Sequence, residues 1–237
     1  MRTQLVVDYR FHPVGQGLFS TGELSIERMN TGHHVSNVCF HWIYDCGSLS
    51  HRSNLIACIN QHKECLNDQS VGLFCLSHFD ADHVNWAAEY LGAVRVEVIA
   101  LPYLTLVERM AIAAYKRASG EFLEFLVEPA VFLTSVSVNK RIQIVLVDGG
   151  GIGILGDDES NYPDDTETQR LDLPPGADPY ASSTFSGQTS SSVSNVRVIK
   201  HNEPVKLDLI WEFAFFNERR ESPGLEMFRT DVVRLLS

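Results

Sequence analysis

No apolar run in this sequence of 237 residues is long enough to cross a lipid bilayer, and Met1 leads into a strand-like segment without a secretory signal. The cysteines are odd in number and show no paired metal-binding spacing, so a disulfide framework is not expected. We therefore expect a protein of the reducing cytoplasm that does not span a membrane. The five cysteines are Cys39, Cys46, Cys58, Cys65 and Cys75.

Positive charge is also scarce, since the formal net charge is −11. The segment 157–167 holds six acidic residues and no basic one. Nothing in the sequence resembles the basic surface of a nucleic-acid-binding protein, which counts against tight binding of a duplex. A nuclease whose bound cations supply the positive field remains compatible with this composition.

The most informative stretch is an apolar segment, residues 72–77, that ends abruptly in a polar cluster. Two imidazoles and two carboxylates follow within six positions: His78, Asp80, Asp82 and His83. Histidine nitrogen and carboxylate oxygen are the ligands that borderline and hard divalent metals prefer. The spacing could supply most of one coordination shell or half of each of two adjacent shells. The alternative is a solvated polar turn between a strand and a helix.

This His-x-Asp-x-Asp-His pattern resembles the metal motif of the metallo-β-lactamase-fold hydrolases, which usually reads His-x-His-x-Asp-His. The variant with Asp80 is similar to the nuclease-like domain of the bacterial competence DNA-uptake channel. Segment 14–17 (VGQG) and segment 43–48 (IYDCGS) resemble upstream motifs of that subgroup. Segments 11–19 and 101–104 together resemble the metallo-β-lactamase-fold component of AVAST-type antiphage defence systems.

The resemblance implies an α/β fold, the αβ/βα sandwich with mixed sheets, over residues 1–237, as the whole fold or as its N-terminal part. It implies one or two divalent ions, zinc or manganese, with His78 and Asp80 on one ion and Asp82 and His83 on the other. Asp82 would be the catalytic residue that orients the nucleophilic water. Asp45 would not bind the ion itself but would hold one of its ligands in place. The extra carboxylate of Asp80 should shift metal preference toward Mn²⁺ or Mg²⁺.

The expected function is that of a metal-dependent hydrolase that uses a metal-activated water. The resemblance favours phosphodiester substrates, with nucleic acid as a candidate substrate, and a role in antiviral defence beside protein partners of such a system. Hydrolysis of peptides or other amides is the rival activity. A degenerate or truncated fold that serves as a binding or regulatory partner is the alternative from another class.

The chain departs from the family pattern downstream of the motif. It has no histidine between His83 and His201, and Trp86 stands where the subgroup usually has glycine. Asp157, in a segment that resembles the family's bridging-aspartate motif, and His201 are the remaining candidates for late ligands. The alternative for Asp157 is a place in the acidic loop, and the alternative for His201 is a surface position beside a strand. Either residues beyond this chain complete the metal site, or the site is incomplete.

Periodicity predicts the elements around the cluster. Leu5, Val7, Tyr9 and Phe11 alternate with polar residues, which predicts a half-buried strand. Further strands are expected at residues 17–25, 38–45, 94–100 and 141–147, with residues 72–77 parallel to 94–100. Helices are expected at 53–61, directly after His83, from the capping box of Thr105 and Glu108, and from 122 to about 132.

The last third of the sequence has a different composition. Glycine, acidic residues, proline and serine dominate from about 148 to 195, which predicts a flexible insertion, acidic and then serine-rich. A strand with one apolar face is expected at 207–215, and a last helix from Ser222.

Overall fold

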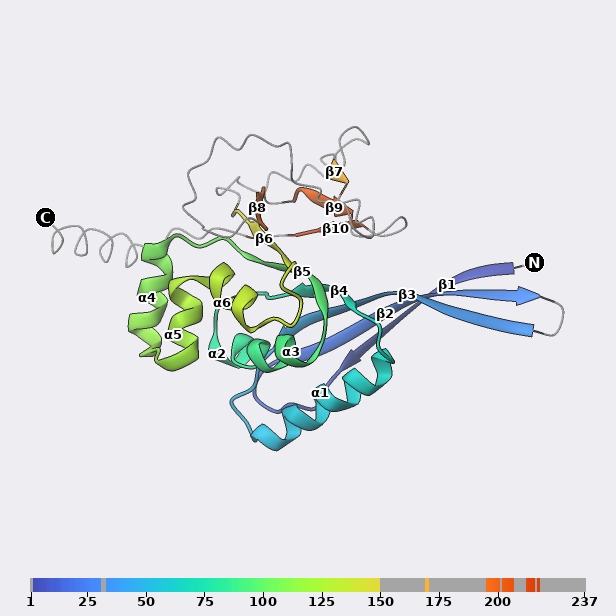
Figure 1. Ribbon diagram of the computed structural model, residues 1–237, viewed down its shortest axis with the longest axis horizontal. Helices are drawn as coiled ribbons and strands as arrows, with labels where there is room; N and C mark the ends of the chain where they lie inside the picture. Colours follow the sequence, from blue (N-terminus) through green and yellow to red (C-terminus); the bar gives the residue numbers. More distant parts are fainter. Residues whose placement is uncertain are drawn as a thin grey trace, which may run out of the picture.

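The computed structural model describes residues 2–30, 33–149, 169–170, 195–200, 202–206, 212–215 and 217. These residues form an α/β protein built on a seven-stranded mixed sheet in the order β1-β2-β3-β4-β5-β6-β8 (Figure 1). The candidate ligands Asp157 and His201, most of the expected flexible insertion, most of the strand at 207–215 and the helix from Ser222 lie outside the described residues.

The first three strands form an antiparallel unit. Strand β1 (Arg2–Phe11) pairs with β2 (Phe19–Asn30), which pairs with β3 (His33–Cys46). Both β2 and β3 are longer than the sequence predicted, and Figure 1 shows their far ends extending away from the body of the molecule. The β2–β3 register shifts between Phe19 and Ser20, and Asp45 is the residue left unpaired by that bulge.

The remaining strands of the large sheet run parallel to β3. They are β4 (Val71–Cys75), β5 (Val96–Pro102), β6 (Gln143–Val147) and β8 (Val196–Ile199). The parallel pairing of β4 and β5 confirms the predicted βαβ unit. Strands with helices on one face and a second sheet on the other are buried on both sides, so their sequences are continuous apolar runs rather than alternating ones.

The helices lie together on one face of this sheet (Figure 1). They are α1 (Arg52–Leu66), α2 (Ala81–Val84), α3 (Ala87–Ala93), α4 (Leu106–Lys116), α5 (Gly120–Val127) and α6 (Pro129–Val136). The predicted capping box is present, because Thr105 accepts from the Glu108 amide while the Glu108 carboxylate accepts from Thr105. None of these helices is long and apolar enough to cross a membrane.

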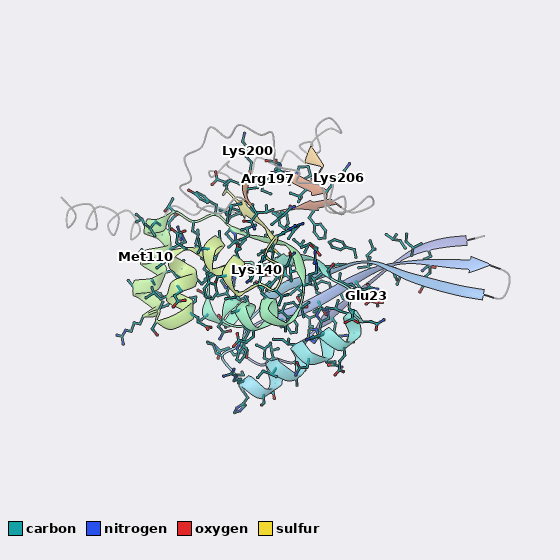
Figure 2. The ribbon with its side chains drawn as sticks, in the orientation of Figure 1. Glu23, Met110, Lys140, Arg197, Lys200 and Lys206 are labelled. Atoms are coloured by element: carbon teal, nitrogen blue, oxygen red, sulfur yellow. The ribbon has the colours of Figure 1, made fainter. Side chains whose placement is uncertain are left out.

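A small sheet covers part of the opposite face. It consists of β10 (Glu212–Ala214), β9 (Pro204–Lys206) and β7 (Gln169–Arg170). Val205, Phe213 and Phe215 pack on the apolar face of the large sheet. Figure 2 shows the two sides of the molecule, with Met110 on α4 among the helices and three labelled basic residues near β8 and β9: Arg197, Lys200 and Lys206.

Two local predictions were wrong. The alternating apolar residues of β1 are not half-buried, because Leu5, Val7, Tyr9 and Phe11 are 44%, 49%, 46% and 70% exposed. β1 is an edge strand, and no described element covers the face that carries these side chains. The single helix expected after His83 is interrupted at Asn85 and Trp86, where the Trp86 amide bonds to the carbonyl of Cys46 instead of continuing the helix.

Candidate metal centre

The candidate centre lies at the carboxyl end of β4, where parallel α/β sheets usually place ligands. Strand β4 ends at Cys75, and the chain then turns through the predicted cluster into α2. Phe79 anchors the turn, because its ring is buried against Phe125 of α5 with centroids 4.9 Å apart. With Phe79 pointing inward, His78 and Asp80 on either side are left partly exposed at the surface.

Asp45 is the buried carboxylate of the site. It has a positive φ of 58°, in the left-handed region that few residues other than glycine adopt, and its side chain is fully buried. The bulge at Asp45 turns this carboxylate toward the loop after β4 instead of leaving it in the alternation of β3. A strained backbone at such a position is a feature often found at functional sites.

Both oxygens of Asp45 are fully engaged. Oδ1 accepts from the Ser77 amide at 2.7 Å, and Oδ2 accepts from the Ser77 hydroxyl at 2.6 Å. Oδ2 also lies 2.7 Å from Nδ1 of His83. A carboxylate that receives Nδ1–H fixes the orientation of the ring and leaves Nε2 as the free lone pair. The resemblance implied a supporting role for Asp45, and this hydrogen bond is of that kind.

Asp45, His78 and His83 each present a ligand atom within 4.8 Å of the others, so this group could hold a metal ion. The rings of His78 and His83 lie 4.0 Å apart between centroids. Because Asp45 already accepts three hydrogen bonds, it is better suited to orienting the His83 ring than to binding an ion directly. The ligand set then needs other oxygens.

Asp80 and Asp82 supply those oxygens. Oδ2 of Asp80 lies 3.7 Å from Nε2 of His78, and Oδ2 of Asp82 lies 3.9 Å from Nε2 of His83. Two atoms bound to one ion at about 2.1 Å lie roughly 3.4 Å apart in a tetrahedral site, and farther apart when the angle is wider. The donor pairs His78–Asp80 and His83–Asp82 therefore have the spacing that a divalent ion needs. His78 and Asp80 lie in the loop after β4, whereas Asp82 and His83 lie in α2; residues 76–83 together are called the ligand loop below. The ligand atoms that all lie within 4.8 Å of one another belong to Asp45, His78 and His83, and Asp80 and Asp82 each approach one histidine only.

Three turns are locked together around the site. The Leu18 amide bonds to the carbonyl of Asp82, and the Gly47 amide bonds to the carbonyl of Leu18. A Cβ on Gly17 or Gly47 would overlap the backbone of Asp82, so only glycine allows these chains to approach so closely. The segments 14–17 and 43–48, which the sequence singled out, therefore support the backbone of the ligand loop.

Two residues that sequence reasoning did not single out also belong to the site. Ser77 links Asp45 to His78, since its hydroxyl donates to Asp45 and lies 2.8 Å from Nδ1 of His78. Lys116, at the end of α4, places Nζ 3.1 Å from Oδ1 of Asp80. Ser77 sits directly before the motif and could have been noticed, whereas nothing in the local sequence connects Lys116 to a loop more than thirty residues away.

The cysteines near the site are not suited to nucleophilic chemistry. Burial, with the nearby Asp45 charge, raises the pKa of the Cys75 thiol to about 12. Burial also raises the pKa of Cys46 well above its usual value. Both thiols therefore stay protonated at neutral pH and are poor nucleophiles and poor metal ligands. Cys46, Cys58, Cys65 and Cys75 are free.

The sequence matches no protein-family model, and no curated protein is significantly similar to it. The assignment of function therefore depends on the arrangement of the residues described above.

Proposed function

We propose that the protein is a metal-dependent hydrolase of the metallo-β-lactamase fold. The observation that carries the proposal is the hydrogen bond from His83 to the buried Asp45, with His78 and two further carboxylates beside it. In metal sites, a histidine ligand is commonly held in orientation by a hydrogen bond from its second ring nitrogen to a carboxylate. The mixed α/β sheet with its ligand loop at the carboxyl end of β4 is compatible with this fold.

The residues would share the work as follows. His78 with Asp80, and His83 with Asp82, would hold one or two divalent ions, zinc or manganese. A bound ion lowers the pKa of water so that it can attack near neutral pH. Asp82, whose carboxylate is partly exposed beside His83, would orient that water and accept its proton. Asp45 and Ser77 would keep the two imidazoles in position.

The bond that is cleaved is a separate part of the proposal. The resemblance to the competence-channel domain favours phosphodiesters, and cleavage of peptides or other amides is the alternative. The net charge of −11 leaves any nucleic-acid substrate dependent on bound cations. Lys116 is the cationic group found nearest to the described ligands, paired with Asp80.

Metal content gives the first test. The purified protein should retain or bind zinc or manganese, and the double variant His78→Ala/His83→Ala should lose it while keeping its circular dichroism spectrum. His51→Ala, which changes an exposed histidine at the start of α1, is the matched control. Unchanged metal content in the double variant, measured by elemental analysis, would rule out this centre.

Turnover gives the second test. A bis-phosphodiester reporter, single-stranded DNA and a fluorogenic amide are incubated with added Mn²⁺, Zn²⁺ or no metal. We expect metal-dependent turnover of at least one substrate and its loss in Asp82→Asn. Equal turnover by the parent and Asp82→Asn would contradict the role of Asp82.

One observation favours a second candidate function, that of a binding or regulatory partner with a degenerate site. Asp80 is paired with the ammonium group of Lys116, which competes with a metal for that carboxylate. Metal binding without turnover of any of the three substrates would support this second function. Antiviral defence is also a proposal that follows from the resemblance. It predicts that phage plating efficiency on cells expressing the defence system depends on His78 and His83.

A further inference from the structure

A cavity of about 260 Å³ lies beside the candidate metal centre, at the carboxyl ends of β4, β5 and β6. Its floor is a row of residues on neighbouring strands, in which Tyr44 pairs with Cys75 and Cys75 pairs with Ala100. Two small side chains in succession leave the sheet surface hollow at this point. Pro102 and Val147 extend the wall, and Ala214, Phe215 and Asn217 close the opposite side.

The lining of the cavity carries no charge. Among the described residues that line it, none is acidic, basic or histidine. Burial raises the pKa of Tyr44 above its ordinary value and the pKa of Cys75 to about 12, so both groups are neutral at physiological pH. An uncharged group would therefore enter without leaving a buried charge unpaired, whereas a charged group would lose hydration without meeting a group of opposite charge in this lining.

The cavity and the centre are connected through single residues. Ser77 lines the cavity, and its hydroxyl bonds to Asp45 and lies 2.8 Å from Nδ1 of His78. Tyr44, on the cavity floor, directly precedes Asp45. The cavity and the candidate ligands are thus adjacent, and Ser77 contacts both.

The volume limits what that substituent can be. Cavities that hold a whole drug-sized ligand span about 300–1,000 Å³, while an apolar cavity of about 150 Å³ accepts a benzene molecule. A cavity of about 260 Å³ therefore fits one aromatic ring or one branched aliphatic group rather than an entire substrate.

We propose that this cavity binds an apolar side chain adjacent to the scissile bond of an amide substrate, which makes the site selective for peptide-like substrates with an aromatic or branched aliphatic residue. This inference rests on the proposed hydrolase function and specifies its substrate. In a peptide, the side chain branches one atom away from the scissile carbonyl, which matches the short separation between cavity and centre. In a nucleic acid, a sugar separates the phosphodiester from the base, so the base lies farther from the bond that is cleaved.

The reaction served is hydrolysis of the amide. The C–N bond breaks, the oxygen of water bonds to the acyl carbon, and protons from water pass to the leaving amine and to solvent. No oxidant, reductant or additional reactant is needed. The cavity takes no part in the bond changes and acts by binding the side chain, so its effect should fall on the choice of substrate.

The experiment measures binding separately from turnover. The full protein is titrated with N-acetyl-phenylalanine amide, N-acetyl-leucine amide and N-acetyl-aspartate amide by NMR, with and without Mn²⁺. We expect the first two compounds to bind and the aspartate compound to bind at least about tenfold more weakly, because its charge would be buried without a partner.

Two variants fill the cavity from neighbouring strands. Ala100→Leu acts from β5, and Val147→Phe acts from β6, where Val147 lines the cavity and belongs to the same apolar cluster as Ala100, so the test stays valid if the first variant folds poorly. Each folded variant should bind N-acetyl-phenylalanine amide at least about tenfold more weakly than the parent. Ala114→Leu, exposed on α4 and outside the cavity lining, is the control and should bind as the parent does.

The outcomes separate this inference from the proposed function. Loss of compound binding in the cavity variants with unchanged metal content supports the cavity as a side-chain site. Equal binding of the phenylalanine and aspartate compounds, or unchanged binding in a folded Val147→Phe variant, overturns it even if the protein proves to be a hydrolase. Preferential cleavage of single-stranded DNA over a phenylalanine-containing amide would also overturn it, in favour of the nucleic-acid alternative.

Discussion

Asp45 is the residue that ties the candidate centre to the fold. Its carboxylate accepts three hydrogen bonds at 2.6–2.7 Å from Ser77 and His83, and it can do so only because a bulge turns it out of the β3 alternation. This arrangement costs folding free energy, since both the positive φ and the buried charge oppose folding. Such a cost is typical of residues at functional sites.

Replacing Asp45 with Asn should weaken metal binding by about 10- to 100-fold, the usual effect of removing a supporting carboxylate. The amide of Asn can accept on one side only, so either the Ser77 amide loses its acceptor or the Ser77 hydroxyl and Nδ1 of His83 lose theirs. Competition against a chromogenic chelator measures the affinity. Asp8→Asn, on the exposed β1, should leave the affinity unchanged. Parent-like metal affinity in Asp45→Asn would contradict the supporting role.

Lys116 should act in the opposite direction. Its ammonium lies 3.1 Å from Asp80, so it both occupies an oxygen of a proposed ligand and repels an incoming cation. We expect Lys116→Gln to bind Mn²⁺ or Zn²⁺ up to roughly tenfold more tightly at low salt, with a smaller gain at high salt because the pair is partly exposed. Lys63→Gln on α1 is the control. A weaker affinity in Lys116→Gln would contradict competition between Lys116 and the metal for Asp80.

At the scale of elements, the site depends on close backbone contact between turns. Gly47 leaves no room for a Cβ against the backbone of Asp82 and His83, both of which belong to the ligand loop. Gly92, within α3, has only the carbonyl of Val136 nearby, at 3.8 Å from a Cβ. A side chain therefore fits at Gly92 but not at Gly47, so substitution by alanine should have opposite effects on stability at the two positions.

Gly47→Ala should destabilise the protein by about 2 kcal/mol or more, since backbone atoms cannot move aside as a flexible side chain can. Gly92→Ala should be neutral or stabilise it by up to about 1 kcal/mol, because alanine is the better helix former. Urea denaturation of both variants measures the change in free energy of unfolding. Equal effects would show that the turn around Gly47 adjusts easily.

The sequence was most informative where a local pattern carries the physical cause. The βαβ unit, the capping box of Thr105 and the placing of His78, Asp80, Asp82 and His83 together after β4 all follow from neighbouring residues. The exposure of Leu5 and its alternating partners could not be predicted, since burial depends on whether another element covers the face. The interruption at Trp86 and the approach of Lys116 to Asp80 likewise come from contacts between distant segments.

For the whole molecule, the buried histidines of the helix-covered core determine how stability responds to pH. His12 and His62 are 8% and 5% exposed, and their partners are the neutral hydroxyls of Thr21 and Tyr90, at 3.0 Å and 2.9 Å. Burial, with the Arg10 charge, lowers the pKa of His12 to about 4, and burial, with nearby His12, lowers that of His62 to about 3. Both imidazoles are therefore neutral in the folded protein.

The sign of the effect follows from proton uptake. An unfolded chain has histidine pKa values of about 6.5, so below that pH the unfolded state binds more protons than the folded state. The stabilisation is fully present above about pH 6.5 and is lost progressively as the pH falls toward 4 and then 3. By pH 5 the loss should be on the order of 2 kcal/mol for each histidine.

Urea denaturation at pH 7.5 and pH 5.0 tests this expectation, and the variant His62→Gln isolates one contribution. Glutamine can still bond to Tyr90 but does not titrate, so the variant should be less stable than the parent at pH 7.5, because the ring packing on Tyr90 and Phe19 is lost, yet should lose less stability on acidification. His51→Gln, at an exposed position, should keep the parent's pH dependence. An identical acid-induced loss in the parent and in His62→Gln would show that His62 is not responsible, and that other groups set the acid limit of the fold.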